Sequence, residues 1–133
     1  MTRSNWLNIS CIGFIFWIIT GCAFDLAHIK FDPVQIKEIA GTSRTFSIQE
    51  DIDLTSLPCG YSRKLGKNTR WEYVGTINQG EVYKPINQCF TLECSNIYEA
   101  YLVIQNDNLI GFYLPVEKGY NSLSKPIPIV LSR

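Results

Sequence analysis

Side chains that could carry acid–base or nucleophilic catalysis are few in this chain and lie far apart. The single histidine, His28, precedes every segment with strand-like patterning, so a Cys–His or Ser–His pair would depend on a residue in the flexible tether expected before the domain. The carboxylates Glu50, Asp51 and Asp53 lie in one loop-like stretch, which does not favour a pair of opposed carboxylates. We therefore expect no catalytic residues and interpret the chain as a non-enzyme.

Cysteine chemistry is a second candidate. Cys59, Cys89 and Cys94 show no Cys-x-x-Cys spacing, so we expect no metal and no other cofactor. If residues 89–94 form one extended strand, its ends lie about 16 Å apart, whereas a disulfide needs Cα atoms within roughly 7 Å. The sequence predicts a disulfide of Cys59 with Cys89 or Cys94. The alternative is that all three are small buried apolar residues.

A basic run places four positive charges within eight residues, at Arg63, Lys64, Lys67 and Arg70, with no acid among them. Close to an anionic surface each such charge adds about 1 kcal/mol of attraction. We interpret the run as a candidate contact with an anionic surface. The alternative is a solvated loop.

The first 22 residues have the layout of a secretory leader. Arg3 gives a positive start, an apolar run covers residues 6–17, and small residues precede Cys22. From Trp6 to Gly21 there are 16 residues, which as a helix reach only ~24 Å, less than the roughly 30 Å of a hydrocarbon core. This length favours a cleaved signal peptide over a membrane anchor.

The stretch Ile19-Thr20-Gly21-Cys22 resembles the lipobox of bacterial lipoprotein precursors. The resemblance implies lipidation of the Cys22 thiol, cleavage before it, acylation of the new amino terminus and attachment to a membrane. Ala23, not Asp, follows the cysteine, and by resemblance to enterobacterial lipoproteins this implies the outer membrane, facing the periplasm. We divide the chain into a signal peptide (1–21), a lipid-anchored tether (22–31) and one domain (32–133).

Composition limits the class of the mature protein. Cleavage would leave 112 residues, enough for one domain and too few for two. It would remove one charged residue, Arg3, and leave eleven basic and twelve acidic side chains, a net charge of −1. Nucleic acid requires a basic field, so we expect no nucleic-acid partner. Abundant Val, Ile, Tyr, Phe and Thr favour strands.

One short helix is predicted at the start of the domain. Asp32 would cap it, Pro33 would be its first residue and Gly41 would end it. Its apolar residues would share one face and lie on a sheet.

Strands are predicted for the rest of the domain, most clearly as a hairpin of residues 98–105 and 109–116 around Asn106-Asp107-Asn108. Pairing Gln105 with Leu109 gives one entirely apolar face and one mixed face on which Tyr101 lies opposite Tyr113. Further strands are expected at residues 45–48, 71–77, 81–86, 89–93 and 127–131, with Gly80 in the left-handed position of a three-residue turn.

These patterns predict a mainly β fold, a small antiparallel barrel or sandwich-like domain with one N-terminal helix. The tyrosine pair, Tyr101 and Tyr113, is a candidate protein interface, since tyrosine combines an apolar body with a polar tip. We expect a lipid-anchored envelope protein with a non-catalytic binding or scaffold role in an envelope or secretion assembly. One alternative is an inhibitor or immunity-type lipoprotein acting on a cell-wall hydrolase, and another is an envelope enzyme.

Overall fold

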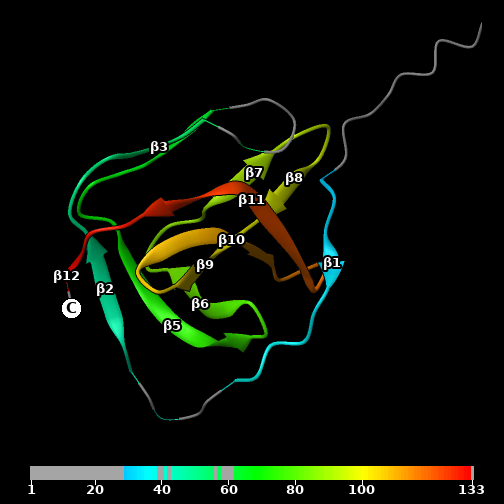
Figure 1. The fold of residues 1–133 in the computed structure, drawn as a ribbon, viewed down its shortest axis with the longest axis horizontal. Coiled ribbons are helices and arrows are strands. Elements are labelled where there is room, and N and C mark those ends of the chain that lie inside the picture. Colours follow the sequence, from blue (N-terminus) through cyan, green and yellow to red (C-terminus); the bar gives the residue numbers. More distant parts are fainter. Residues whose placement is uncertain (1–28, 39–40, 42, 56, 58–61, 133) are drawn as a thin grey trace, which may run out of the picture.

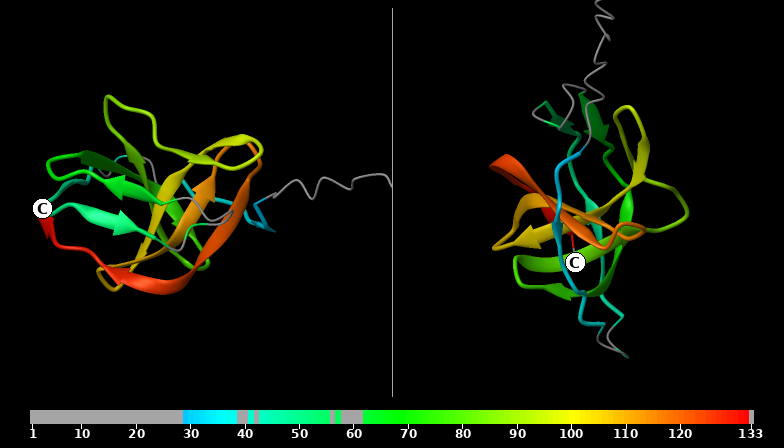
Figure 2. Two further views of the ribbon diagram at one scale, coloured as in Figure 1. Left: turned by 90° about the horizontal axis from the view of Figure 1, so that it is seen from above. Right: turned by 90° about the vertical axis from the view of Figure 1, so that its right-hand side faces the viewer.

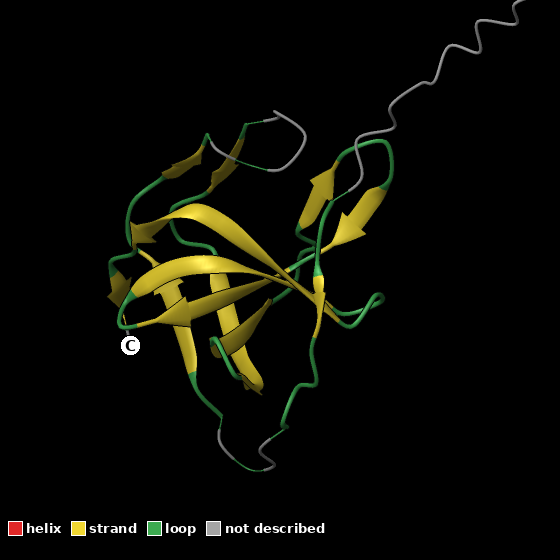
Figure 3. Cartoon of the chain, turned by 45° about the vertical axis from the view of Figure 1, so that its right-hand side comes forward, coloured by secondary structure: helices red, strands yellow, loops and turns green. Residues whose placement is uncertain are grey.

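The computed structural model describes residues 29–38, 41, 43–55, 57 and 62–132. Every regular element in these residues is a β-strand (Figures 1 and 3). The predicted mainly β character is therefore confirmed. The strands are β1 (Asp32–Pro33), β2 (Thr45–Ile48), β3 (Ile52–Leu54), β4 (Arg63–Leu65), β5 (Arg70–Ile77), β6 (Gly80–Pro85), β7 (Thr91–Glu93), β8 (Ile97–Glu99), β9 (Tyr101–Gln105), β10 (Asn108–Leu114), β11 (Gly119–Pro128) and β12 (Leu131–Ser132).

Eight of these strands form one antiparallel sheet in the order β1-β11-β10-β9-β6-β5-β2-β12, and β3–β4 and β7–β8 form two small sheets. The large sheet is strongly curved but open, with β1 and β12 at its two edges (Figures 1 and 2). The antiparallel prediction is confirmed. Of the two predicted architectures, a barrel or a sandwich-like domain, the described strands do not form a closed barrel.

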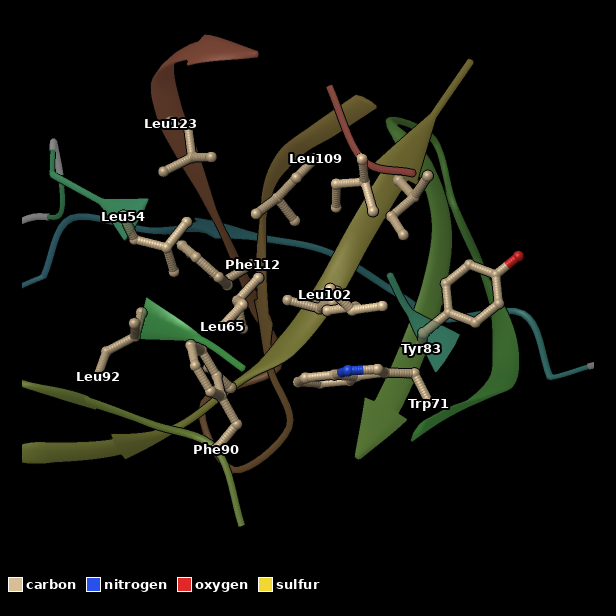
Figure 4. Close-up of a cluster of buried hydrophobic side chains, with 14 of the residues drawn as sticks. Leu54, Leu65, Trp71, Tyr83, Phe90, Leu92, Leu102, Leu109, Phe112 and Leu123 are labelled. Carbon is tan, nitrogen blue, oxygen red and sulfur yellow. The ribbon is translucent and has the colours of Figure 1, made fainter. Parts of the chain in front are cut away.

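The inner face of the large sheet carries the main hydrophobic cluster, which includes Trp71, Leu102 and Phe112. Leu54 and Leu65 of the β3–β4 sheet belong to the same cluster, so this small sheet packs over the inner face (Figure 4). The β7–β8 sheet does the same with its apolar side chains. Aromatic rings interlock at the centre, where Phe90 stacks on Phe112 at 5.8 Å and meets the edge of Trp71.

The β9–β10 hairpin has the predicted register from Gly111 to Tyr113, but the prediction is wrong at both ends. Residues 98–99, predicted to continue the hairpin, belong to β8 and pair with β7, and the turn is shorter than predicted. Its loop has two residues, Asn106 and Asp107, both with positive φ, as a tight primed turn requires. The register next to the turn therefore differs by one residue from the prediction. A β-bulge between Leu109 and Gly111 compensates, so that Tyr113 lies opposite Tyr101 as expected.

The β5–β6 hairpin also differs at its turn. Ile77 pairs with Gly80, so Gly80 begins β6 and its φ is not positive. A Cβ atom on Gly80 would lie 2.6 Å from the backbone oxygen of Ile104, so the position needs glycine for close approach to β9, not for a left-handed turn.

The predicted N-terminal helix is not confirmed. Residues 32–33 pair with β11, and Lys37 forms an isolated bridge with Thr76 on β5, so the described part of this segment is extended. An isolated helix of about nine residues is marginal in water, whereas the extended segment gains backbone partners in the sheet. Pro33 fits this arrangement because β1 is an edge strand, where a missing N–H is tolerated.

The predicted signal peptide, the predicted lipidation site Cys22, most of the predicted tether and Cys59 lie outside the described residues. Among the residues that are described, no helix is long and apolar enough to cross a membrane.

Candidate functional site

The candidate site is a groove on the outer face of the large sheet, opposite the main core. A second hydrophobic cluster lies on this face and includes Val82, Val103 and Tyr113. The N-terminal segment, defined here as residues 29–38, runs across this face from β11 to β5. It is fixed at both ends: the Val34 N–H donates to the Lys118 oxygen at 3.0 Å, and Lys37 and Thr76 exchange two backbone bonds of 2.8 and 3.0 Å.

Two β-bulges supply side chains to the outer face that a regular strand would direct elsewhere. In β5 the register shifts between Tyr73 and Gly75, and both Val74 and Ile77 then join the outer cluster. In β10 the shift between Leu109 and Gly111 brings Ile110 and Tyr113 to the same face. Val74 and Ile77 are three residues apart, and so are Ile110 and Tyr113. In a strand without a bulge, residues at this spacing would lie on opposite faces of the sheet.

The groove lies between the N-terminal segment and the sheet and has a volume of about 650 Å³. Apolar and aromatic residues form much of its lining: Val34, Ile36, Val74, Tyr101, Tyr113 and Pro115. Its polar lining consists of Gln35, Glu38, Lys84 and Lys118. The groove therefore offers an amphipathic surface of a size typical of ligand sites.

Gly75 holds the N-terminal segment close to the sheet. A Cβ atom at this position would lie 2.5 Å from the backbone oxygen of Lys37 and 3.0 Å from the Ile36 side chain. Any larger residue would therefore push the segment outward. The absence of a side chain at Gly75 allows the backbone bonds between Lys37 and Thr76 to form at normal length.

The tyrosines of the outer face are neutral near neutral pH, as phenols ordinarily are, and burial raises their pKa values further. Burial raises the pKa of Tyr101, with the nearby Glu99 carboxylate acting in the same direction. It also raises the pKa of Tyr113, with a further contribution from Glu38, and that of Tyr120. The Tyr101 and Tyr113 rings lie 6.2 Å apart at a tilt of 43°. The groove thus presents neutral phenols, which can donate and accept hydrogen bonds.

The two lysines that line the groove differ in their surroundings. Lys84 forms a salt bridge of 3.7 Å with Glu72 on the neighbouring strand. Lys118 forms no salt bridge with any residue in the described part of the chain and is exposed. Lys118 is therefore the cation of the groove best placed to meet an acidic group of a partner.

The four residues of the predicted basic run make different contacts in the structure. Arg63 turns inward, with its guanidinium 4.5 Å from the centre of the Phe90 ring and hydrogen bonds to the backbone oxygen and the hydroxyl of Thr91. Lys64 faces the acidic stretch, at 3.9 Å from Asp51 and 4.0 Å from Asp53.

The other two cations of the run, Lys67 and Arg70, line a shallow hollow beside Asn87 and Gln88. The backbone N–H of Lys67 also donates to Asp51 at 2.7 Å. The four basic residues therefore do not form one continuous patch.

The predicted cysteine sites are only partly described. Cys94 is disulfide-bonded and Cys89 is an exposed free thiol. Within the described ranges, no group of three His, Cys, Asp or Glu side chains is placed to hold a metal ion.

Several groove residues were missed from the sequence, notably Val34, Lys84 and Lys118. Val34 and Ile36 are half-buried while Gln35 and Lys37 are exposed, and this period of two was the available signal for an extended segment. Comparisons with protein-family models, with curated proteins and with solved structures find no match to this chain.

Proposed function

We propose that this chain is a lipid-anchored cell-envelope protein that binds a partner protein and has no catalytic role. In this proposal Cys22 carries acyl chains and holds the domain at the outer membrane, facing the periplasm. The resemblance of residues 19–22 to a lipobox supports the anchoring. The groove on the outer face supports the binding role, as a scaffold contact in an envelope or secretion assembly.

The shape and composition of the groove are the observation that carries this proposal. The groove is preformed, because backbone hydrogen bonds fix the N-terminal segment at Val34 and at Lys37. A preformed site loses little conformational entropy on binding. Tyr101 and Tyr113 supply aromatic surface with polar tips, a combination enriched in protein interfaces. A partner segment with an apolar side chain for the floor and a carboxylate for Lys118 fits this surface.

The binding role is tested by site-specific photocrosslinking in cells that express the full chain. Benzoylphenylalanine replaces Tyr101 in the groove, or Val130, an exposed residue near the opposite edge of the sheet, as the matched control. We expect one discrete crosslinked product from position 101 and none from position 130. The product should disappear in the V74D variant, which adds a charge to the groove.

A product that forms equally at both positions, or that survives V74D, would contradict binding in the groove. The anchor is tested separately by metabolic labelling with an alkyne fatty acid. The natural chain should become labelled and sediment with membranes, and the C22A variant should not be labelled. Labelling that persists in C22A would place the acyl group elsewhere.

A further inference from the structure

We infer that the domain rests on the surface of the lipid bilayer through three exposed apolar side chains, Phe31, Ile97 and Val116. We call these three residues the apolar rim. This inference rests on the proposed lipid anchor at Cys22 and goes beyond it, because an anchor alone does not orient a domain.

Exposure singles out the members of the rim. Ile97 is 71% exposed, Val116 is 73% exposed and Phe31 is 39% exposed. Single exposed apolar residues are common on protein surfaces, so it is the gathering of three at one end of the molecule that carries information. The fourth large apolar residue exposed in the described part of the chain is Val130, at 58%. An exposed apolar group gains free energy when it leaves water for a lipid interface.

The three rim residues lie at the same end of the molecule. Phe31 packs on Gly119, where its ring occupies the space that a Cβ atom would need, so it lies beside the β10–β11 turn that carries Val116. The β7–β8 hairpin, which carries Ile97, lies on that side too, near the start of the N-terminal segment (Figures 1 and 3). Val130 precedes β12, at the opposite side.

The length of chain before the described residues decides which end faces the bilayer. Seven residue steps separate Cys22 from Ile29. Fully extended they span at most ~25 Å. A domain of about 100 residues has a radius of gyration near 13 Å, which corresponds to a diameter of roughly 34 Å. A chain anchored at Cys22 can therefore bring the rim to the membrane easily, whereas the end with Val130 must stay farther away.

The charges near the rim indicate that apolar contact, not attraction to anionic lipid, makes this surface bind. In the sequence, each of the cations Lys30 and Lys118 is within two residues of an acid, Asp32 or Glu117. Glu99 lies two residues after Ile97 on β8. The rim thus has no excess of positive charge, and a zwitterionic bilayer should suffice. Three side chains cannot hold a soluble protein on a membrane for long, but they can orient one that is already anchored.

The test uses the full chain expressed in bacteria, purified in detergent and reconstituted into phosphatidylcholine vesicles with or without brominated acyl chains, which quench tryptophan. Mass spectrometry first determines whether Cys22 is acylated. V116W places a reporter in the rim and V130W is the matched control. Cleavage before Cys22 removes Trp6 and Trp17, and the buried Trp71 gives both variants the same background.

We expect bromination to reduce the emission of V116W several-fold more than that of V130W, and I97D added to V116W to diminish the difference. Equal quenching of the two variants in an acylated protein would overturn the rim and leave the anchor intact. A protein without acyl chains at Cys22 would overturn the proposed function, and the rim with it.

Discussion

Phe112 and Tyr113 are neighbours on β10, yet they belong to two very different faces of one sheet. Phe112 is completely buried in the inner cluster, where its ring stacks on Phe90. Tyr113 is also buried, but its ring borders the groove and lies beside Tyr101. Burial alone therefore does not show that a residue serves only to stabilise the fold. Phe112 fills a closed core, whereas Tyr113 lines an open groove.

The covering of the two faces explains the difference. Side chains from both small sheets, such as Leu54 and Leu92, close the inner face. One extended segment crosses the outer face and contacts it through Val34 and Ile36. A single strand cannot fill the width of a sheet, so a groove remains beside it. The inner face thus stabilises the fold, and the outer face leaves an amphipathic surface available.

The comparison is tested most strongly by truncating these two neighbours. F112A should lower the free energy of unfolding by about 3–5 kcal/mol, because it leaves a cavity in a closed core. Y113A should cost only about 1–2 kcal/mol, because water already reaches the space beside its ring. Urea unfolding followed by the fluorescence of Trp71 measures both. Equal losses would mean that the outer face is a second core and not a binding surface.

A smaller effect is expected from adding a side chain at Gly75, where the N-terminal segment lies close to the sheet. G75A should destabilise the protein by about 1–3 kcal/mol, because the added Cβ displaces the backbone at Lys37. The control is G66A, whose Cβ would meet the Thr69 side chain at an ordinary 3.5 Å. Hydrogen exchange should become faster at the amides of Lys37 and Thr76 in G75A alone. Unchanged exchange there would show that the segment does not depend on this close approach.

The sequence predicted the paired tyrosines because the alternation of residues in a hairpin is local. Residues 98–116 carry a period of two, and the pairing of Tyr101 with Tyr113 follows from it. The bulge at Ile110 could not be predicted, since it depends on a two-residue turn and on the match of β10 with both neighbours. The shorter turn shifts the register by one residue and the bulge shifts it back. The pairing of Tyr101 with Tyr113 is therefore the predicted one, although neither feature was predicted.

The N-terminal segment shows the opposite case. Asp32-Pro33 is a common helix start, and the local pattern fitted a helix. The backbone hydrogen-bond partners of the segment, the Lys118 oxygen and Thr76, are distant in the chain. The sequence near residues 32–38 therefore does not indicate them. The groove exists only because this segment is extended. The alternation of Val34 to Lys37 indicated an extended segment, but nothing in the local sequence indicated where on the sheet it would lie.

The smallest expected effect is on the pH dependence of stability. It concerns the ionisation of the tyrosines on the outer face. Burial raises the pKa of Tyr101, Tyr113 and Tyr120, all on the outer face, above the usual value of about 10. The folded chain then holds these protons more tightly than the unfolded chain. Their contribution to stability is fully present below pH of about 10 and is lost as the pH rises through the raised pKa values.

Replacing these three tyrosines by phenylalanine should therefore flatten the decrease in unfolding free energy above pH of about 10, as measured by urea titrations at a series of pH values. Near neutral pH the same variant should be slightly less stable, because the Tyr120 hydroxyl no longer donates to the Ile110 oxygen. An alkaline decrease as steep as that of the natural chain would mean that these hydroxyls are open to water. In that case the groove would be more fully solvated than its geometry indicates, and its floor would offer a partner less dry surface to bind.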